Sequence, residues 1–226
     1  MSLDYQISSL FLMVRQIMTM NSLRRRALGL LLLGGCVGMT IIPSGAKAAN
    51  PGTLAPAFSL IDTFGKAFSL KDFSGRWVAL EWVNPECPFV KKHYQSGNMQ
   101  STQKQAADSK VVWVQINSTN ANHSEYKTPK EMAAWNSEMK AVGVIAALDS
   151  DGKVGRAYGA KTTPQMVLIN PQGMVVYHGA IDSIRSANPA DIARATNYMK
   201  QAMAEALNGR PVSVAESVPY GCTVKY

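Results

Sequence analysis

Two cysteines are the residues of this chain best suited to redox chemistry. Cys87 lies in the stretch NPECPFVKKHY, residues 84–94, and Val90 stands where a C-x-x-C pair would hold its second sulfur. Cys222 comes much later, near the end of the sequence. A thiolate at the first position would attack peroxides or disulfides, and the second thiol is a candidate partner for the oxidised sulfur.

The sequence around the first cysteine predicts a junction between a strand and a helix. Residues 77–83 form an apolar run of strand length, and Pro88 suits the first turn of a helix over 89 to about 107. A thiol at this junction is expected to face free backbone N–H groups and the positive end of the helix dipole, which favour the thiolate. Lys91 and Lys92 are expected to add positive potential. The alternative is a buried and inert thiol, which is common for cysteine.

The rest of the chain alternates between strand and helix patterns. Strands are predicted at 58–60, 111–117, 145–148, 165–170 and 174–181. Helices are predicted at 129–140 and 189–208, and a short helix is predicted after the turn at 149–152, ending at about Gly159. Pro171-Gln172-Gly173 predicts a hairpin turn. This order predicts one α/β sandwich with a mixed sheet over residues 49–209, followed by an irregular tail over 210–226 that carries Cys222.

Charge in this chain is concentrated at its beginning. Of its 23 basic and 15 acidic residues, five basic and one acidic lie within the first 48 positions, which leaves 18 and 14 and a formal charge of +4 for the rest. No stripe of basic residues interleaved with aromatic ones occurs in the sequence. We therefore expect no nucleic-acid partner.

Residues 1–48 have the pattern of an export leader. Arginines at 24–26 precede an apolar run, and the small-residue stretch at 46–48 is typical of a cleavage site. We predict a cleaved signal peptide, with Met20 as the natural first residue, and a periplasmic or secreted protein. The arginines resemble a twin-arginine leader. Alternatively, LGGC ending at Cys36 resembles a lipobox, and a lipid on that cysteine would attach the protein to a membrane.

Two longer segments carry a resemblance to a known family. Residues 158–180, YGAKTTPQMVLINPQGMVVYHGA, resemble the thioredoxin-fold segment in which a cis-proline precedes a strand, and Pro164 fills that place. Residues 55–83 are similar to the opening of the peroxiredoxin-like branch, which includes the alkyl hydroperoxide reductase/thiol-specific antioxidant and redoxin proteins. Residues 55–208 together thus resemble this branch of the thioredoxin superfamily. The resemblance implies a thioredoxin-like α/β sandwich with a mixed central sheet, helices on both faces and an extra N-terminal hairpin.

The resemblance also implies roles for individual residues. Cys87 would reduce a peroxide or disulfide, and Glu81, the one charge in the apolar run, would exchange protons with its sulfur as the buried acid of thioredoxins does. Thr163 would offer backbone hydrogen bonds to the substrate, and Pro164 would shape the contact surface. A thiol electron donor protein is the implied partner, and no cofactor or metal is implied. The alternative for Glu81 is an edge position in which its carboxylate faces water.

The sequence departs from the peroxiredoxin pattern close to the cysteine. Typical members place Thr or Ser three residues before the reactive cysteine and Pro seven before it, where this chain has Asn84 and Leu80. Asn84 is expected to supply a different polar group to the substrate. Pro88, directly after Cys87, is expected to contact the substrate as well. The choice between peroxide and disulfide as the substrate stays open.

Cys222 allows three interpretations. A cysteine in a terminal tail can fold back and condense with an oxidised Cys87, as the resolving cysteine of two-cysteine peroxiredoxins does. The two cysteines can instead form a permanent disulfide, because disulfides persist in exported proteins, and this bond would stabilise the fold by about 4 to 5 kcal/mol. The third interpretation is a free thiol or a link to another molecule.

Two other classes of function remain as alternatives. A non-enzymatic thioredoxin-fold binding domain would account for the missing C-x-x-C pair and the missing hydroxyl, with Cys87–Cys222 as a structural cross-link. A copper-handling protein would use Cys87 with His93, although thioredoxin-fold copper chaperones carry a second nearby cysteine, and position 91 of this chain is Lys.

Overall fold

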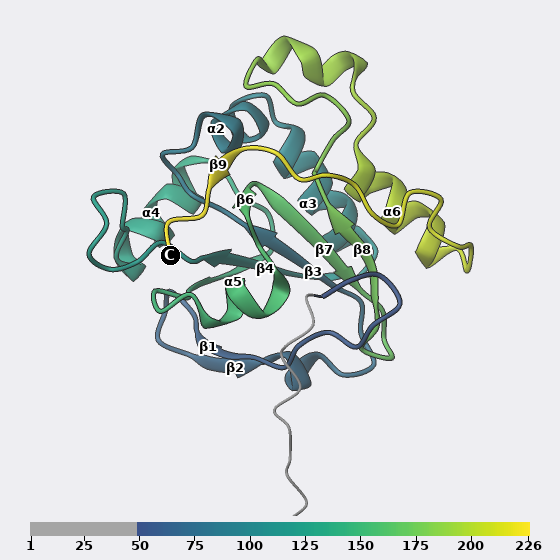
Figure 1. Ribbon diagram of the computed structural model, residues 1–226, viewed down its shortest axis with the longest axis horizontal. Helices are drawn as coiled ribbons and strands as arrows, with labels where there is room; N and C mark the ends of the chain where they lie inside the picture. Colours follow the sequence, from purple (N-terminus) through teal and green to yellow (C-terminus); the bar gives the residue numbers. More distant parts are fainter. Residues whose placement is uncertain (1–48) are drawn as a thin grey trace, which may run out of the picture. The chain divides into compact units, whose positions relative to one another are not determined.

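The computed structural model of the chain describes residues 49–226. The predicted signal peptide over 1–48, the predicted first residue Met20 and the lipobox cysteine Cys36 lie outside the described residues. Figure 1 shows the described part as a central sheet with helices around it.

The central sheet has five strands in the order β5-β4-β3-β7-β8. Their bounds are β3 Val78–Trp82, β4 Val112–Asn117, β5 Val144–Leu148, β7 Gln165–Ile169 and β8 Val175–Gly179. Strands β3, β4 and β5 run parallel, whereas β7 is antiparallel to β3 and β8 is antiparallel to β7. The strand that leads to Cys87, β3, therefore lies at the centre of a mixed sheet, and all of its residues are buried.

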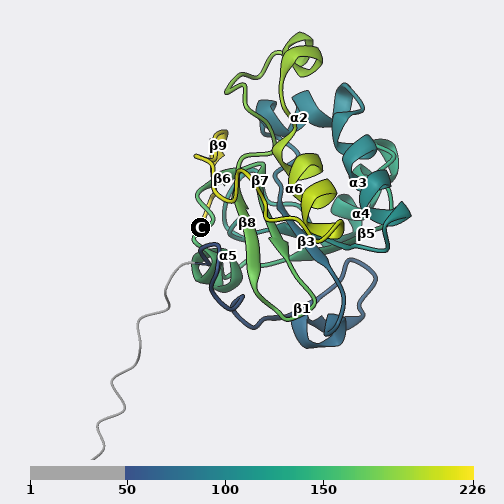
Figure 2. The ribbon, with the colours of Figure 1, turned by 90° about the vertical axis from the view of Figure 1, so that its right-hand side faces the viewer.

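Helices cover both faces of this sheet (Figures 1 and 2). One face packs against α2 (Pro88–Gln95), α3 (Asn98–Asp108), α4 (Pro129–Glu138) and α6 (Tyr198–Leu207). The other packs against α5 (Lys153–Tyr158) and an N-terminal hairpin of β1 (Ser59–Ile61) and β2 (Ala67–Ser69), which the 3-10 helix η1 (Leu70–Phe73) follows. These layers confirm the predicted thioredoxin-like sandwich with its extra hairpin.

Alternation along β3 decides which residues meet the helices beside Cys87. Leu80 and Trp82 belong to the core on the α5 side, whereas Ala79 and Val83 belong to the core that also contains Cys87. Glu81 has the same parity as the second pair, because side chains alternate between the two faces of a strand. Its carboxylate therefore lies on the face that carries the cysteine.

The helix predicted over 89 to about 107 is in fact two helices, so that prediction was wrong. Gly97 separates α2 from α3 and has φ +74, a left-handed conformation that glycine adopts without steric cost. The glycine was visible in the sequence, but the helical pattern on both sides of it concealed the break.

The helix predicted over 189–208 is also divided. Its first part is the 3-10 helix η2 (Pro189–Arg194), and α6 begins only after Ala195 has taken an extended conformation. Asn197 caps α6 by accepting a hydrogen bond from the backbone N–H of Lys200, at an N–O distance of 2.9 Å. Asparagine at this position favours a new helix start over a continuous helix.

The tail over 210–226 was predicted to be irregular, and one short part of it is not. Strand β9 (Cys222–Thr223) pairs with β6 (Thr162–Thr163) in an antiparallel two-stranded sheet. In Figure 1 the yellow tail runs from α6 across the molecule to β9 and the C-terminus. The tail thus brings the second cysteine to the loop that precedes β7.

Within residues 49–226, no helix combines the length and the apolar character that crossing a membrane requires.

Candidate active site around Cys87

Cys87 is the N-cap residue of α2, and Pro88 occupies the first helical position. The preceding turn delivers it from the end of β3: the Cys87 backbone N–H donates to the Asn84 carbonyl oxygen at 3.1 Å, and the Asn84 side chain accepts from the Glu86 N–H at 2.9 Å. The cysteine side chain is buried, with 1% of its surface exposed. The predicted junction between strand and helix is confirmed.

The sulfur of Cys87 contacts the loop before β7. Its thiol donates a hydrogen bond to the carbonyl oxygen of Thr163 at an S–O distance of 3.1 Å. The peptide bond between Thr163 and Pro164 is cis, as the resemblance implied. Cys87 caps the N-terminus of α2 as expected, but its side chain forms no hydrogen bond to a backbone N–H of that helix.

Cys222 reaches the same loop through strand pairing. Cys222 lies opposite Thr163 in the β6–β9 register, and the Val224 backbone N–H donates to the Lys161 carbonyl oxygen at 3.0 Å. Since Thr163 also accepts the hydrogen bond from Cys87, one residue holds both cysteines together. The sequence could not show this arrangement, because residues far apart in the chain form it.

The pKa of the Cys222 thiol is raised mainly by burial. Burial raises this pKa to about 12, and the neighbouring Cys87 adds to the shift. At neutral pH this group is therefore a thiol, and it must lose its proton when its sulfur forms a bond. Both cysteines are free in the structure.

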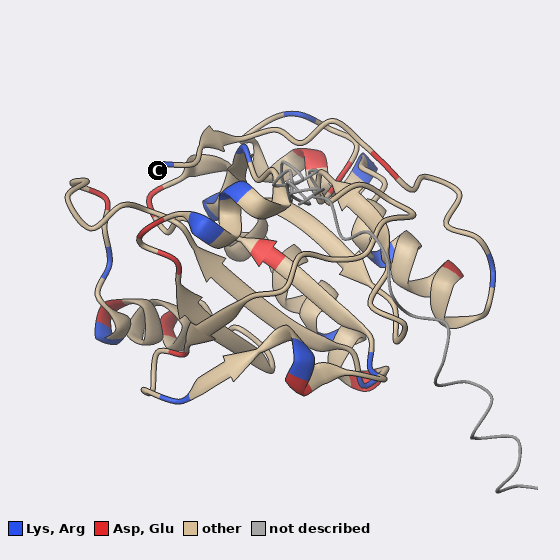
Figure 3. Ribbon diagram, turned by 60° about the horizontal axis from the view of Figure 1, so that its bottom comes forward, with Lys and Arg blue, Asp and Glu red and all other residues tan. Residues whose placement is uncertain are grey.

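The two lysines after Cys87 do not provide the free positive charge that the sequence suggested. Lys91 forms an exposed ion pair with Glu86 at 3.3 Å, and Lys92 forms a completely buried one with Asp182 at 3.1 Å. Figure 3 shows the same mixture on a larger scale, with basic and acidic residues interspersed along the ribbon. Both lysines are thus paired with acidic side chains.

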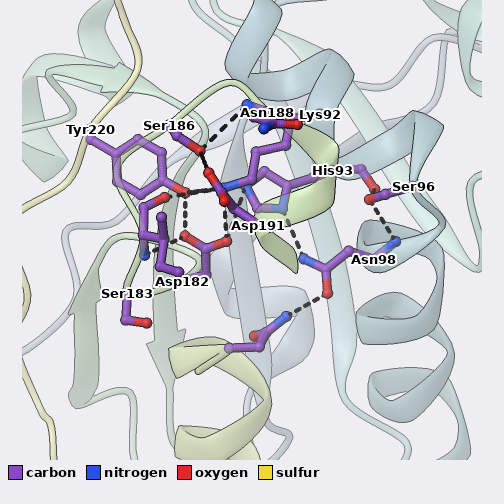
Figure 4. Close-up of polar contacts among 12 residues, drawn as sticks. Lys92, His93, Ser96, Asn98, Asp182, Ser183, Ser186, Asn188, Asp191 and Tyr220 are labelled. Carbon is purple, nitrogen blue, oxygen red and sulfur yellow. Dashed lines mark hydrogen bonds and ion pairs between the residues drawn. The ribbon is translucent and has the colours of Figure 1, made fainter. Parts of the chain in front are cut away.

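The buried pair belongs to a polar cluster that includes the tail (Figure 4). The Tyr220 hydroxyl donates to Asp182, and the Lys92 ammonium donates to the Tyr220 oxygen at 3.3 Å and to the Ile184 carbonyl at 3.1 Å. The Tyr220 ring also packs edge-on against Phe89, with 5.8 Å between centroids. This cluster anchors the tail two residues before Cys222.

Glu81 is fully buried, so the interpretation that placed it at a sheet edge facing water was wrong. Its carboxylate accepts hydrogen bonds from the Tyr94 hydroxyl at 2.8 Å, the Trp113 indole at 2.8 Å and the Gln103 amide at 3.4 Å. Burial raises the pKa of Glu81 to about 7, although these donors act in the opposite direction. Within residues 49–226, its hydrogen bonds go to these side chains and not to either sulfur.

The raised pKa of Glu81 predicts a specific pH dependence of stability. Between about pH 4.5 and 7 the folded protein holds a proton that the unfolded chain has lost, so ionisation of this group destabilises the fold as pH rises, by about 3 kcal/mol in total. We expect Glu81→Gln to remove this contribution. Urea unfolding at pH 5 and pH 8 would show it as a difference between the two proteins.

Wild type has to be compared with Glu81→Gln because His93 affects the pH dependence of stability in the opposite direction. Burial lowers the pKa of His93 to about 4, so its contribution to stability is lost as pH falls from about 6.5 towards 4. This contribution is common to wild type and variant and cancels in their difference. Parallel stability profiles for the two proteins from pH 5 to 8 would contradict the assignment to Glu81.

Asn84 is fully engaged by the protein. Its amide N–H donates to the Glu125 carboxylate at 2.6 Å, while its oxygen holds the turn before Cys87. The negative charge of Glu125 also contributes to the raised pKa of Cys222. The sequence analysis missed Glu125, since a lone acid in a polar loop carries no motif that points to a site.

His93 is held away from a ligand role. Its Nδ1 lies 2.8 Å from the Asn98 amide nitrogen, and its Nε2 lies 3.4 Å from the Tyr220 hydroxyl. Among residues 49–226 no group of three or more His, Cys, Asp or Glu side chains is arranged to hold a metal ion. A copper role for His93 would require these contacts to break.

Comparison with known proteins extends this picture. The AhpC/TSA family model matches residues 51–178. The thiol-disulfide oxidoreductase ResA of Bacillus subtilis (strain 168) is 30% identical over 159 residues, which cover 66% of this chain and 79% of that protein.

Two solved structures are similar over most of the chain. A hypothetical protein from Sinorhizobium meliloti 1021 has a TM-score of 0.66 and 25% identity, with 80% of this chain and 96% of that one covered. An uncharacterized conserved protein from Geobacillus kaustophilus has a TM-score of 0.65 and 26% identity, with coverage of 79% and 93%.

Proposed function

This chain belongs to the AhpC/TSA family, and from that premise we propose that it is a two-cysteine thiol oxidoreductase in which Cys87 attacks the oxidant and Cys222 resolves the product. Thiol-based oxidoreduction is the chemistry named for its ResA relative. One observation supports the finer assignment: Thr163 hydrogen-bonds to Cys87 and pairs with Cys222, so that both cysteines lie against the same residue.

The first step is a two-electron oxidation of Cys87. With a peroxide, the thiolate forms an S–O bond while the O–O bond breaks, and the leaving oxygen takes up a proton to become water or an alcohol. With a disulfide, the thiolate forms an S–S bond to one sulfur and the other leaves as a thiolate. In both cases the electrons come from the Cys87 sulfur.

The second step closes the bond between the two cysteines. Cys222 loses its proton, and its sulfur attacks Cys87 and displaces hydroxide from the sulfenic acid or the remaining substrate thiolate from the mixed disulfide. The displaced group takes up a proton. A thiol electron donor protein then reduces the disulfide, becoming oxidised itself, and restores both thiols.

Glu81 assists proton transfer in this proposal. Its raised pKa, about 7, means that both of its protonation states are populated near neutral pH, as a group that accepts and returns protons requires. The Tyr94 hydroxyl, which donates to Glu81, belongs to the same helix that Cys87 caps.

Substrate contacts are assigned to the residues around the sulfur. The Thr163 hydroxyl is buried and has no hydrogen-bond partner within the described residues, so it is free to bind the oxygen of an oxidant. This hydroxyl would take the role of the Thr or Ser hydroxyl that typical peroxiredoxins carry three residues before the reactive cysteine, where this chain has Asn84. Pro164 and Pro88 shape the remaining contact surface, whereas Asn84, proposed from the sequence as a further contact, acts by holding the turn that presents Cys87.

Stopped-flow mixing of the reduced protein with hydrogen peroxide and with a small disulfide tests the function directly. We expect at least one of them to oxidise Cys87 and to yield an intramolecular disulfide, which mass spectrometry identifies. A Cys87 that neither oxidant modifies would end the enzymatic proposal.

The alternative is a binding domain with a structural Cys87–Cys222 cross-link. The burial of Cys87 and the Asn84 and Leu80 substitutions favour it. The reduction potential separates the two functions, because structural disulfides typically lie below about −300 mV and catalytic ones lie higher. A Cu(I) titration without tight binding would remove the copper-handling function.

We further propose that the protein is exported to the periplasm or secreted after cleavage behind Ala48. The support is the order of arginines, apolar run and small residues in the sequence. The intact mass of the exported protein would distinguish this cleavage from lipidation at Cys36.

A further inference from the structure

We propose that the tail restricts the oxidant to small molecules, because it occupies the strand edge that a polypeptide substrate would need. This inference rests on the proposed function and names its substrate class. The part of the tail concerned is residues 216–226. It contacts the rest of the protein along most of its length, from the bridge between Glu216 and His178 to the hydrogen bond from the Asn120 N–H to the Lys225 carbonyl at 2.7 Å.

The edge in question lies next to the reactive sulfur. Cys87 bonds to the carbonyl of Thr163, so a substrate sulfur that approaches Cys87 has to lie against β6. An extended polypeptide docks on such an edge by forming backbone hydrogen bonds to it. Here Cys222 and Thr223 have taken that position.

Gly221 allows the tail to come this close. Its φ of +136 lies in a region that favours glycine, and a Cβ atom at this position would lie 1.9 Å from the Thr163 carbonyl oxygen. No side chain other than hydrogen fits against that backbone without moving one of the two strands. Gly221 is therefore the position at which an added side chain would push the tail away from β6.

Tyrosines hold the tail on both sides of Cys222. Tyr220 inserts into the buried cluster with Lys92 and Asp182 that Figure 4 shows. Tyr226 donates a hydrogen bond to the Ala160 carbonyl at 2.7 Å, and the Arg156 guanidinium lies over its ring at 4.4 Å. A polypeptide would have to displace these contacts before it could pair with β6.

The tail is therefore expected to select oxidants by their size and not by their chemical type. Hydrogen peroxide, a small organic hydroperoxide or a low-molecular-weight disulfide can reach a sulfur that is 1% exposed through a small local opening. An extended polypeptide with a disulfide cannot, because it needs the whole edge of β6. The electron donor instead meets Cys222, the half-buried cysteine of the pair, from the outer side of the tail.

The test compares the rates at which a small and a large disulfide react with Cys87, in proteins that retain the resulting mixed disulfide. The parent is the full chain with Cys222→Ser, in which the mixed disulfide on Cys87 persists. The probes are 2-hydroxyethyl disulfide and the disulfide-linked dimer of a 20-residue peptide with one central cysteine, so that in both reactions the leaving thiolate is a separate molecule that diffuses away. We expect the ratio of peptide rate to small-disulfide rate to rise at least 10-fold when Gly221→Ala is added.

Gly209→Ala, added to the same parent, is the matched control. Gly209 also has a positive φ, +69, but a Cβ there would meet nothing within 4 Å. We expect its ratio to equal that of the parent. Equal ratios in the parent and the Gly221→Ala protein would overturn the inference, whereas a Cys87 that reacts with no oxidant in any variant would overturn the proposed function itself.

Hydrogen exchange at Val224 reports whether the tail has moved. Its N–H bonds to Lys161 only while β9 is docked, so we expect faster exchange with Gly221→Ala. Tyr220→Phe provides a second and milder way to loosen the tail, because it removes the hydroxyl that bonds Asp182. A Val224 amide that stays protected in both variants would contradict the assignment of these residues as the ones that hold the tail.

Discussion

Replacing Cys222 by serine is expected to stop turnover while the first oxidation of Cys87 continues. The oxidised Cys87 then has no neighbouring thiol and must wait for one from solution, and loss of such an intramolecular partner reduces a rate by roughly 100-fold or more. Peroxide or disulfide consumption in the presence of excess dithiol measures turnover, and a single-turnover experiment measures the first step.

Two results would distinguish the interpretations of Cys222. Under the proposed function, the serine variant accumulates a sulfenic acid or mixed disulfide on Cys87, and Cys87→Ser abolishes both steps. A serine variant that turns over at the wild-type rate would show that Cys222 does not resolve the product. Inactivity of the wild type, combined with a large loss of thermal stability in the variant, would favour the structural cross-link instead.

The largest effect on stability is expected from Lys92→Met. Lys92 and Asp182 are both buried, and the change leaves the Asp182 carboxylate without its cation in a region that water does not reach. Breaking one partner of a buried ion pair costs about 3 to 5 kcal/mol. Because Tyr220 bonds to both members, the same change is also expected to loosen the tail. Urea denaturation at pH 7 measures the loss.

Two further variants make this prediction specific. Lys104→Met removes a lysine from the exposed pair with Asp108, at 2.8 Å, where solvent screens both charges, and we expect almost no change in stability. Lys92→Met combined with Asp182→Asn removes both charges, and we expect the double variant to recover part of the lost stability. A single variant as stable as the Lys104→Met control would contradict a structural role for the buried pair.

The local features of the site were predictable from short stretches of sequence. An apolar run with one acid, followed by cysteine and proline, predicts a buried strand, a turn and a helix start, and the structure places Glu81, Cys87 and Pro88 accordingly. The cis bond before Pro164 was predictable only through the family resemblance. These features depend on the periodicity of neighbouring residues and on the restricted backbone of proline, both of which are local.

Helix boundaries were less predictable. Gly97 ends one helix and Asn197 begins another, although the pattern of apolar residues continues on both sides of each. Periodicity shows which face is buried, but it does not show where the backbone leaves the helix. Capping contacts decide that, and they depend on what each helix packs against.

The sequence by itself determined the place of Cys87 at the end of the central strand and, through the family resemblance, the thioredoxin-like sandwich. It left open whether Glu81 is buried or faces water, and the structure decided for burial. Only the tertiary structure decided that Cys222 meets Cys87, that Lys92 is neutralised by Asp182 and that Gly221 passes against Thr163. The physical reason is the range of the interactions. Strands and helices follow from residues close together in the chain, whereas the site is completed by a tail whose partners lie in other elements and whose own residues carry no periodic pattern.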